Sequence, residues 1–100
     1  MARRTPKRLA EKLLAIRLSL DLSQRGLIRK MGLEEELQQA EVSMYESGRR
    51  IPGILVLREY ALLAGVWIDY LVADELDLPE KLPAKMSARS FTDGKRKRLK

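Results

Sequence analysis

Amide and guanidinium side chains gather in the middle of this chain, and both can contact a nucleic acid. Gln38 and Gln39 carry amides, and one glutamine amide can pair with both N6 and N7 of adenine. Arg49 and Arg50 follow Gly48, and a short glycine-led loop can lay two guanidinium groups against a phosphate backbone. These residue types therefore indicate contacts with bases and with phosphates.

The composition argues against an enzyme. The chain of 100 residues has no cysteine and no histidine. It can therefore form no disulfide framework or thiolate metal site, and imidazole can act neither as a general base nor as a zinc ligand. No pair of carboxylates stands in a context that suggests a catalytic pocket. We expect no catalytic residue, no metal site and no cofactor.

Charge is distributed unevenly along the chain. Residues 1–30 carry nine Lys/Arg and two acids, residues 31–83 carry four and eleven, and residues 84–100 carry seven and one. The net charges of the three segments are thus +7, −7 and +6. Basic ends suit phosphate contacts. The alternative, that they only keep the protein soluble, stays open.

Length and composition predict one folded domain between two basic ends. We expect an N-terminal arm at 1–5, a domain at 6–78 and a flexible tail at 79–100, since Pro79 and Pro83 end regular structure and charge dominates beyond them. The arm and its neighbours Lys7 and Arg8 suit a phosphate strand or a minor groove, and a basic cluster stands at 95–98. No run is long enough to span a membrane and no signal peptide is visible, which favours a cytoplasmic protein.

Apolar residues recur at helical spacing, and no run alternates at the period of a strand. The first helix is expected at about Pro6–Leu20, with Thr5 as its cap. The second is expected to begin at Ser23 and to end at Gly32, which can adopt the left-handed conformation.

Three further helices complete the expected all-α bundle. The third contains Leu37, Val42 and Tyr45 and stops at Gly48. The stripes expected to be buried in the last two are Ile54, Leu57, Ala61 and Ala64, followed by Val66, Ile68, Leu71 and Val72. Five short helices that each bury one stripe predict a compact bundle.

The stretch from Leu22 to Pro52 resembles the helix-turn-helix of phage repressor and Cro-type DNA-binding domains, the XRE family. The family pattern is S-Q-x-x-L-A-x-x-x-G, a recognition helix and I-E-x-G-x-x-x-P; here Ser23-Gln24, Gly32 and the run Tyr45–Gly48 take these places. Pro52–Val72 is similar to the family's P-x-L-x-x-L-x-x-x-A-x-x-L-G-V-x-x-D-x-L-L. The resemblance covers roughly two thirds of the chain and implies a compact five-helix fold of the lambda repressor-like type.

The resemblance implies a sequence-specific DNA-binding transcriptional regulator, with repression as its expected mode, in a bacterium or phage. Double-stranded DNA would be its partner, with the helix around Gln38–Tyr45 in the major groove. The residues expected to face bases are Gln38, Gln39, Ala40, Glu41, Ser43 and Met44. The residues expected to hold phosphates are Gln24, Arg25, Arg29, Arg49 and Arg50, with Lys30 as a further choice.

The expected base-reading face has an unusual composition. Ala40 suits a thymine methyl group and Glu41 suits cytosine N4, but no Arg or Lys is available for guanine. The alternative is that 38–41 is an ordinary solvated helix start. By the same resemblance Glu46 is structural and pairs with Arg17, whereas the alternative is a surface glutamate.

The sequence departs from the family pattern between Gly32 and Glu46. In the family the glutamate stands ten positions after the glycine, whereas here it stands fourteen positions after it, which indicates a four-residue insertion. Glu34, Glu35 and Glu36 fall in or beside it, where phosphates would repel them. The extra residues form either a longer turn or an added turn of helix. We prefer the longer turn, because Leu33 and Leu37 can both point inward.

Trp67 stands where the family usually has a small or polar residue. It is either exposed at an interface or folded back over Leu63 and Tyr70. With Tyr70 it is the candidate contact of a homodimer, since two copies on a palindrome read more bases than one. The alternative function is an antitoxin-like module that holds a protein partner such as a toxin, for which Trp67 and the acidic insertion would be suited.

Overall fold

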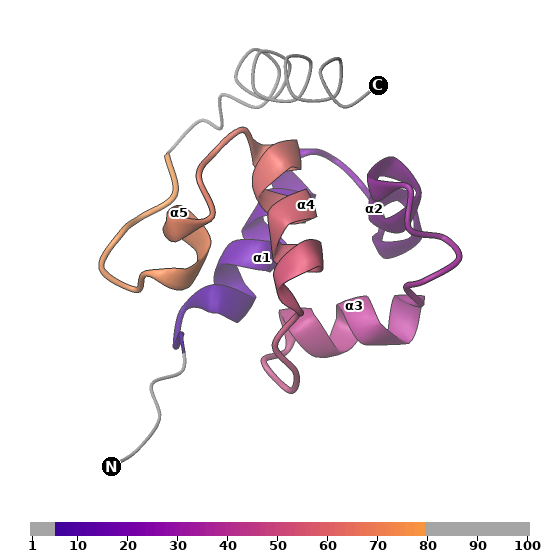
Figure 1. Cartoon of the computed structure of the whole chain (residues 1–100), viewed down its shortest axis with the longest axis horizontal. Helices are drawn as coiled ribbons and strands as arrows, with labels where there is room; N and C mark the ends of the chain where they lie inside the picture. Colours follow the sequence, from indigo (N-terminus) through magenta and orange to yellow (C-terminus); the bar gives the residue numbers. More distant parts are fainter. Residues whose placement is uncertain (1–5, 80–100) are drawn as a thin grey trace.

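The protein folds into five helices in the computed structural model, which describes residues 6–79 (Figure 1). The helices are α1 (Leu9–Ser19), α2 (Gln24–Met31), α3 (Gln39–Glu46), α4 (Ile54–Ala64) and α5 (Asp69–Val72). No strand occurs in the described residues, so the all-α prediction is confirmed. None of these helices is long and apolar enough to cross a membrane. The expected arm at 1–5 and the tail from 80 onward lie outside the described residues.

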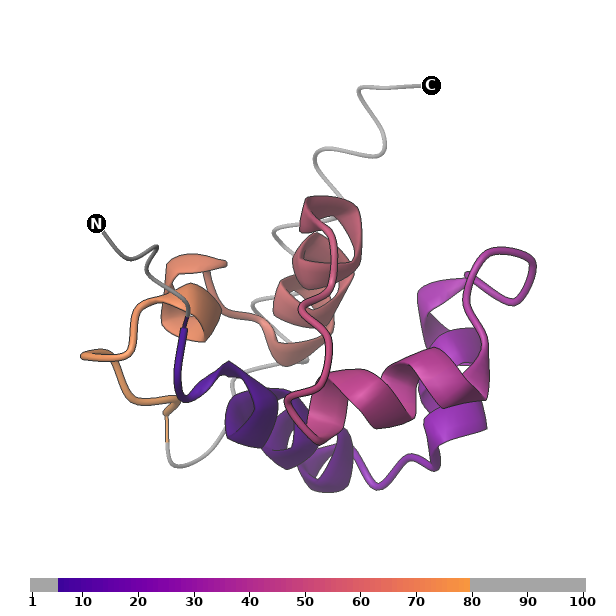
Figure 2. The same ribbon diagram turned by 90° about the horizontal axis from the view of Figure 1, so that it is seen from below.

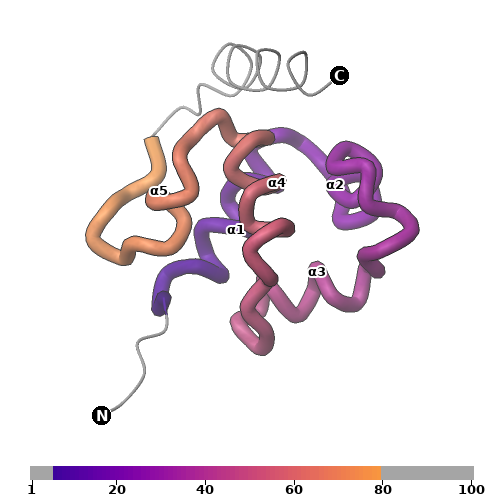
Figure 3. Tube along the Cα trace, viewed as in Figure 1, coloured from indigo at the N-terminus to yellow at the C-terminus, as the bar shows by residue number. Residues whose placement is uncertain are grey.

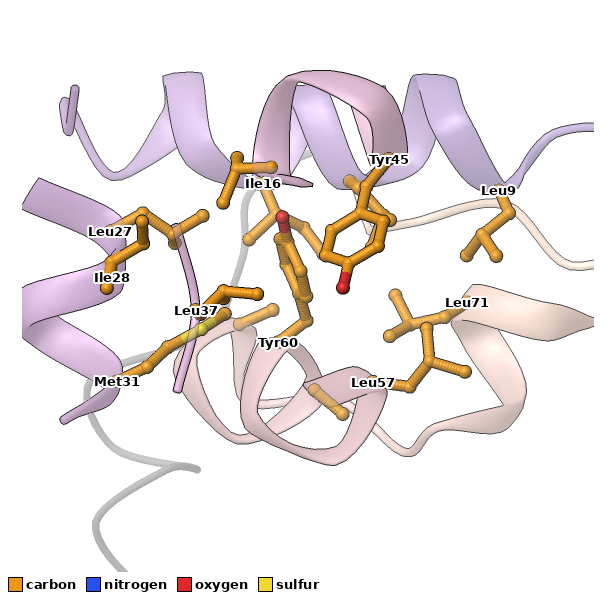
Figure 4. Packing of buried hydrophobic residues seen from close by; sticks show 14 of the residues in the cluster. Leu9, Ile16, Leu27, Ile28, Met31, Leu37, Tyr45, Leu57, Tyr60 and Leu71 are labelled. Carbon is orange, nitrogen blue, oxygen red and sulfur yellow. The ribbon is translucent and has the colours of Figure 1, made fainter. Parts of the chain in front are cut away.

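Helix α1 contacts α3, α4 and α5, and α2 contacts α3 and α4. Figure 1 shows α1 and α4 at the centre, with α3 below them and α2 and α5 at opposite sides. The core forms where side chains of α1, α2 and α3 meet those of α4 and α5 (Figure 4). Its fully buried hydrophobic members include Leu13, Ile16, Leu27, Val42, Tyr60 and Leu71.

Helix α2 begins and ends where the sequence predicts. The Ser23 hydroxyl accepts a hydrogen bond from the Gly26 backbone N–H at 2.9 Å. Gly32 follows the helix with φ of 73°, a conformation that costs glycine little. Leu27, Ile28 and Met31 form its buried face. Both signals are local, which is why the sequence was sufficient here.

The predicted start of the first helix at Pro6 is wrong, because α1 begins at Leu9. The chain before it is held by a distant carboxylate. Asp74 accepts hydrogen bonds from the backbone N–H groups of Lys7 and Arg8, each at 2.9 Å. These bonds lower the pKa of Asp74 and tie the entry of α1 to the end of the domain. The predicted cap Thr5 lies outside the described residues.

Three further expectations about the helices are corrected. Leu37 is buried but precedes α3, because the inserted turn delays the helix until Gln39. Val66 is buried but lies before α5, which is a single turn. Ile54 and Val72 are exposed, so neither belongs to a buried stripe. The buried face of α4 keeps the predicted Leu57, Ala61 and Ala64 and adds Tyr60 and Leu62.

Within residues 6–79, Lys12 is the one charged residue that is fully buried, with 2% of its surface exposed. Its ammonium group donates to the carbonyls of Tyr70, Ala73 and Leu76 at 2.8, 2.9 and 2.6 Å. Burial lowers the pKa of Lys12, and the three bonds offset the cost of keeping the charge inside. Lys12 therefore fastens α5 and the segment after it to α1.

Replacing Lys12 by methionine tests this fastening. Lys12→Met should lower the free energy of unfolding by about 3 kcal/mol, because methionine fills the space but leaves three carbonyls without their charged donor. Urea denaturation followed by circular dichroism measures the loss. Lys30→Met, at an exposed position of α2, is the matched control and should change stability little. Equal stability of both variants would show that the carbonyls do not depend on Lys12.

Candidate nucleic-acid interface

Hydrogen bonds between side chains join α2 to α3. The Gln39 amide nitrogen donates to the Gln24 amide oxygen at 3.2 Å. The Gln24 nitrogen in turn donates to Glu46 at 3.1 Å. Arg25 completes the set, because its Nε donates to the Gln39 amide oxygen at 2.8 Å. The structure thus brings together three residues that the sequence named as DNA contacts.

Glu46 anchors this set to α1. Its carboxylate accepts hydrogen bonds from Nε and Nη2 of Arg17 at 2.7 and 3.0 Å. The Arg17 and Glu46 side chains are 15% and 7% exposed, and the bonds to Glu46 raise the pKa of Arg17. Arg17 also donates to the Leu22 carbonyl at 2.8 Å, in the connection between α1 and α2. The predicted pairing is confirmed, and the alternative of a surface glutamate is wrong.

Helix α3 presents a polar face to solvent and an apolar face to the core. Val42 and Tyr45, two of the apolar residues predicted for this helix, are buried. The expected base-reading residues that are exposed are Gln38, Gln39, Ala40 and Ser43, whereas Glu41 and Met44 are half-buried. The face available to a ligand therefore consists mainly of amides, a methyl group and a hydroxyl.

Glu41 has two roles in the structure that the sequence analysis missed. Its carboxylate accepts a hydrogen bond from the backbone N–H of Gln38 at 2.9 Å, which stabilises the start of α3. It also lies 3.6 Å from Nη1 of Arg50. The sequence does carry a signal for the first role, because Glu41 stands three residues after Gln38, the residue that precedes α3. Contact with cytosine remains a prediction and would require the carboxylate to exchange these partners.

The loop after α3 keeps Arg49 and Arg50 beside the end of that helix. The backbone N–H groups of both arginines donate to the Met44 carbonyl, at 2.9 and 3.3 Å. Gly48 makes the reversal with φ of 80°, where a side chain would be strained. Both arginines are exposed. The loop is thus fixed at its backbone while the guanidinium groups remain accessible.

The insertion forms a turn and does not lengthen α3. The backbone N–H groups of Glu36 and Leu37 donate to the Leu33 carbonyl at 3.0 and 2.8 Å. Leu37 is buried and Leu33 is half-buried against the core, whereas Glu34, Glu35 and Glu36 are exposed. Figures 2 and 3 show this turn at the edge of the molecule, beyond α2. The longer turn, which we preferred, is confirmed.

A groove lies between α2, the inserted turn and the start of α3. Its volume is about 490 Å³, and its lining residues are Arg25, Ile28, Arg29, Glu34, Leu37, Gln38, Gln39 and Ala40. It therefore places two of the expected phosphate contacts beside three of the expected base contacts. Among the described residues, no group of three or more acidic side chains could hold a metal ion.

Trp67 lies in the connection between α4 and α5, at the end of α4 that is away from α3 (Figure 1). It is 64% exposed, so it is not a core residue. It lines a groove of about 220 Å³ along α4, whose other lining residues are Ile54, Arg58, Ala61, Leu62, Val66 and Ile68. Tyr70 is half-buried against the core, and its carbonyl accepts from Lys12.

Comparison of the chain with models of protein families, with curated protein sequences and with solved structures finds no match. The resemblance to the phage repressor and Cro-type domains therefore rests on the residues quoted above.

Removal of the Glu46 carboxylate should cost far more stability than removal of a carboxylate with a weaker ion pair. Glu46→Ala leaves Arg17 buried without its partner, and we expect a loss of about 3 kcal/mol. Glu59→Ala is the control: its ion pair with Arg58 is long at 3.6 Å and more exposed, and such pairs contribute about 1 kcal/mol or less. Urea denaturation measures both. Similar losses in the two variants would contradict the anchoring role of Glu46.

Proposed function

We propose that this protein is a sequence-specific DNA-binding transcriptional regulator of the lambda repressor-like type, acting as a repressor and reading the major groove with α3. The observation that carries the proposal is the hydrogen-bonded unit of α2 and α3. Gln24 and Gln39 join the two helices, and Glu46 with Arg17 fixes them to α1. A reading helix must be held rigidly to contact bases in register.

The surface chemistry of α3 supports the proposal. An α-helix fits the major groove, where each base pair has a distinct pattern of donors and acceptors. The exposed amides of Gln38 and Gln39 can read such a pattern, and Ser43 adds a hydroxyl. Ala40 can contact a thymine methyl group. The half-buried Met44 would touch only the edge of the groove.

Arginines flank this surface at both ends and would position it on the phosphates. Arg25 and Arg29 belong to α2, and Arg49 and Arg50 follow α3. Gln24 has one amide hydrogen left after its bond to Glu46, and that hydrogen can reach a phosphate oxygen. Contacts of this kind fix orientation without reading sequence.

Selection of bound duplexes from a random pool tests the proposal directly. A sequence-specific protein should enrich one motif, and its affinity should fall steeply with salt because phosphate contacts release counterions. A pool that stays random after repeated rounds, with binding insensitive to salt, would refute the proposal.

The arginine loop should contribute affinity without selectivity. Arg49→Ala and Arg50→Ala should weaken binding to all duplexes alike and lower the salt slope by about one unit per lost contact. Arg58→Ala, on α4, removes the same charge from the groove beside Trp67. It serves as the control on a duplex with a single half-site, where no contact between two copies is needed. Titrations of a preferred and a scrambled duplex at several salt concentrations give both quantities. If the loop variants behave like Arg58→Ala, the loop does not face DNA.

We propose further that the protein binds DNA as a homodimer through the groove beside Trp67. Ile54 and Trp67 line this groove and are 65% and 64% exposed, and contact between two copies would remove this apolar surface from water. The connection that carries Trp67 lies away from α3, so both could be engaged at once (Figure 1). Tyr70 is a weaker candidate because it is half-buried.

Trp67→Ser should turn cooperative binding at two half-sites into weak binding at one, and should leave the helical circular-dichroism signal unchanged. Leu18→Ser removes an apolar side chain that is 60% exposed on α1 and should leave cooperativity intact. Binding curves on a palindrome and on a single half-site distinguish the outcomes. Cooperative binding that survives Trp67→Ser would place the dimer contact elsewhere.

The acidic turn favours a second candidate function, an antitoxin-like module that holds a protein partner. Glu34, Glu35 and Glu36 are exposed at the edge of the molecule, where they would repel phosphate but suit a basic protein surface. Replacing all three by glutamine should leave DNA affinity equal or higher if DNA is the main partner. Capture of a basic protein by the native chain and not by this variant would favour the second function.

A further inference from the structure

A chain of hydrogen bonds runs from Arg25 through Gln39 and Gln24 to Glu46. Its direction is fixed, because the group at one end can only donate and the group at the other can only accept. A guanidinium group can only donate, so the Gln39 atom that faces Arg25 is the amide oxygen. An ionised carboxylate can only accept, so the Gln24 atom that faces Glu46 is the amide nitrogen. Gln39 must then donate to Gln24, as it does at 3.2 Å. Neither amide can be reversed without breaking a bond.

This fixed direction determines what Gln39 offers to a ligand. Its amide has two hydrogens and two acceptor lone pairs, and the bonds to Gln24 and Arg25 use one of each. One N–H donor and one oxygen lone pair of the Gln39 amide remain, and their positions relative to each other are fixed. Adenine presents the matching pair, the N7 acceptor and the N6 donor, whereas guanine presents two acceptors. A Gln39 amide fixed in this orientation can therefore form two hydrogen bonds with adenine but not with guanine.

Arg25 gives Gln39 its second point of attachment. The bond from Gln24 alone, at 3.2 Å, would let the exposed side chain pivot around it. The bond from Arg25 is shorter, at 2.8 Å, and a charged donor makes it stronger. Two points of attachment restrict the amide, so less side-chain freedom is lost when a base binds.

We propose that Arg25 is a positioning residue that sets base specificity: its Nε holds the Gln39 amide in the order that pairs with adenine and not with guanine. This inference rests on the proposed function, since it assumes that α3 meets bases. It extends the expected role of Arg25, whose remaining guanidinium hydrogens stay available for a phosphate. The specificity of the site then depends on a residue of α2, outside the reading helix.

Arg25→Lys separates the two roles of the arginine. Lysine keeps the positive charge and a phosphate contact, but it has no Nε–H in the middle of a planar fork. The charge, and with it the salt slope, should be retained, and any change in phosphate contact should alter the affinity for preferred and scrambled duplexes by the same factor. Preference for an adenine over a guanine at the Gln39 position, expected to be about tenfold or more in the native protein, should fall by about threefold or more. Arg29→Lys, on the same helix and in the same groove, is the control and should keep the full preference.

The experiment uses the full chain and duplexes that carry each of the four bases at every position of the selected motif. Gln39→Ala is included to find the position that Gln39 reads, where its loss should abolish the preference. Circular dichroism and the melting temperature should be unchanged in Arg25→Lys, because Arg25 is exposed.

Each outcome is decisive. Loss of preference in Gln39→Ala and Arg25→Lys, but not in Arg29→Lys, supports the inference. Loss in Gln39→Ala alone overturns it and leaves the proposed function standing. An unchanged preference in Gln39→Ala also overturns it, since Gln39 then reads no base. A native protein without preference among duplexes refutes both the inference and the proposed function.

Discussion

The buried pair of Arg17 and Glu46 is the interaction on which the arrangement of the first three helices depends. Taking two charges out of water is costly, and the cost is offset only when the remaining polar atoms are also bonded. Here the guanidinium group meets both carboxylate oxygens and the Leu22 carbonyl, and the carboxylate also accepts from Gln24. The pair therefore joins α1, the connection after it, α2 and the end of α3 at one point.

A second set of polar contacts holds the other end of α1. Lys12 binds three carbonyls at and after α5, and Asp74 holds the backbone before α1. Helix α1 is thus fixed by charge at both ends while its apolar face fills the core. One buried polar atom has no such compensation: the Tyr60 hydroxyl has no hydrogen-bond partner among the described residues, and burial raises its pKa. The ring of Tyr60 contributes apolar contacts that outweigh this cost.

The sequence predicted features that depend on neighbouring residues and missed those that depend on distant ones. The Ser23 cap and the Gly32 stop follow from local residue types, and the structure has both. The start of α1 depends on Asp74, which lies 66 residues after Arg8, so no local pattern marks it.

The candidate site shows the same division between local and distant signals. The outward position of Gln38 and Gln39 follows from their place in the family pattern, whereas the bond from Arg25 to Gln39 joins residues 14 apart that meet only after folding. The resemblance to a known family supplied the pairing of Arg17 with Glu46, which spacing alone could not give.

The composition of α3 explains why positioning matters more here than in a reading helix with arginines. The charge of a guanidinium group attracts phosphates in any orientation, so an arginine contributes affinity even when it is not aligned with a base. Residues 38–46 contain no Arg or Lys. Their two charged side chains, Glu41 and Glu46, form ion pairs with arginines of the same protein. If our proposal holds, selectivity among bases must come from neutral amides. Their hydrogen bonds distinguish one base from another only when the amide N–H and oxygen are correctly oriented toward the base. Affinity would come from arginines on neighbouring segments, so the protein would separate attraction to DNA from the reading of its sequence.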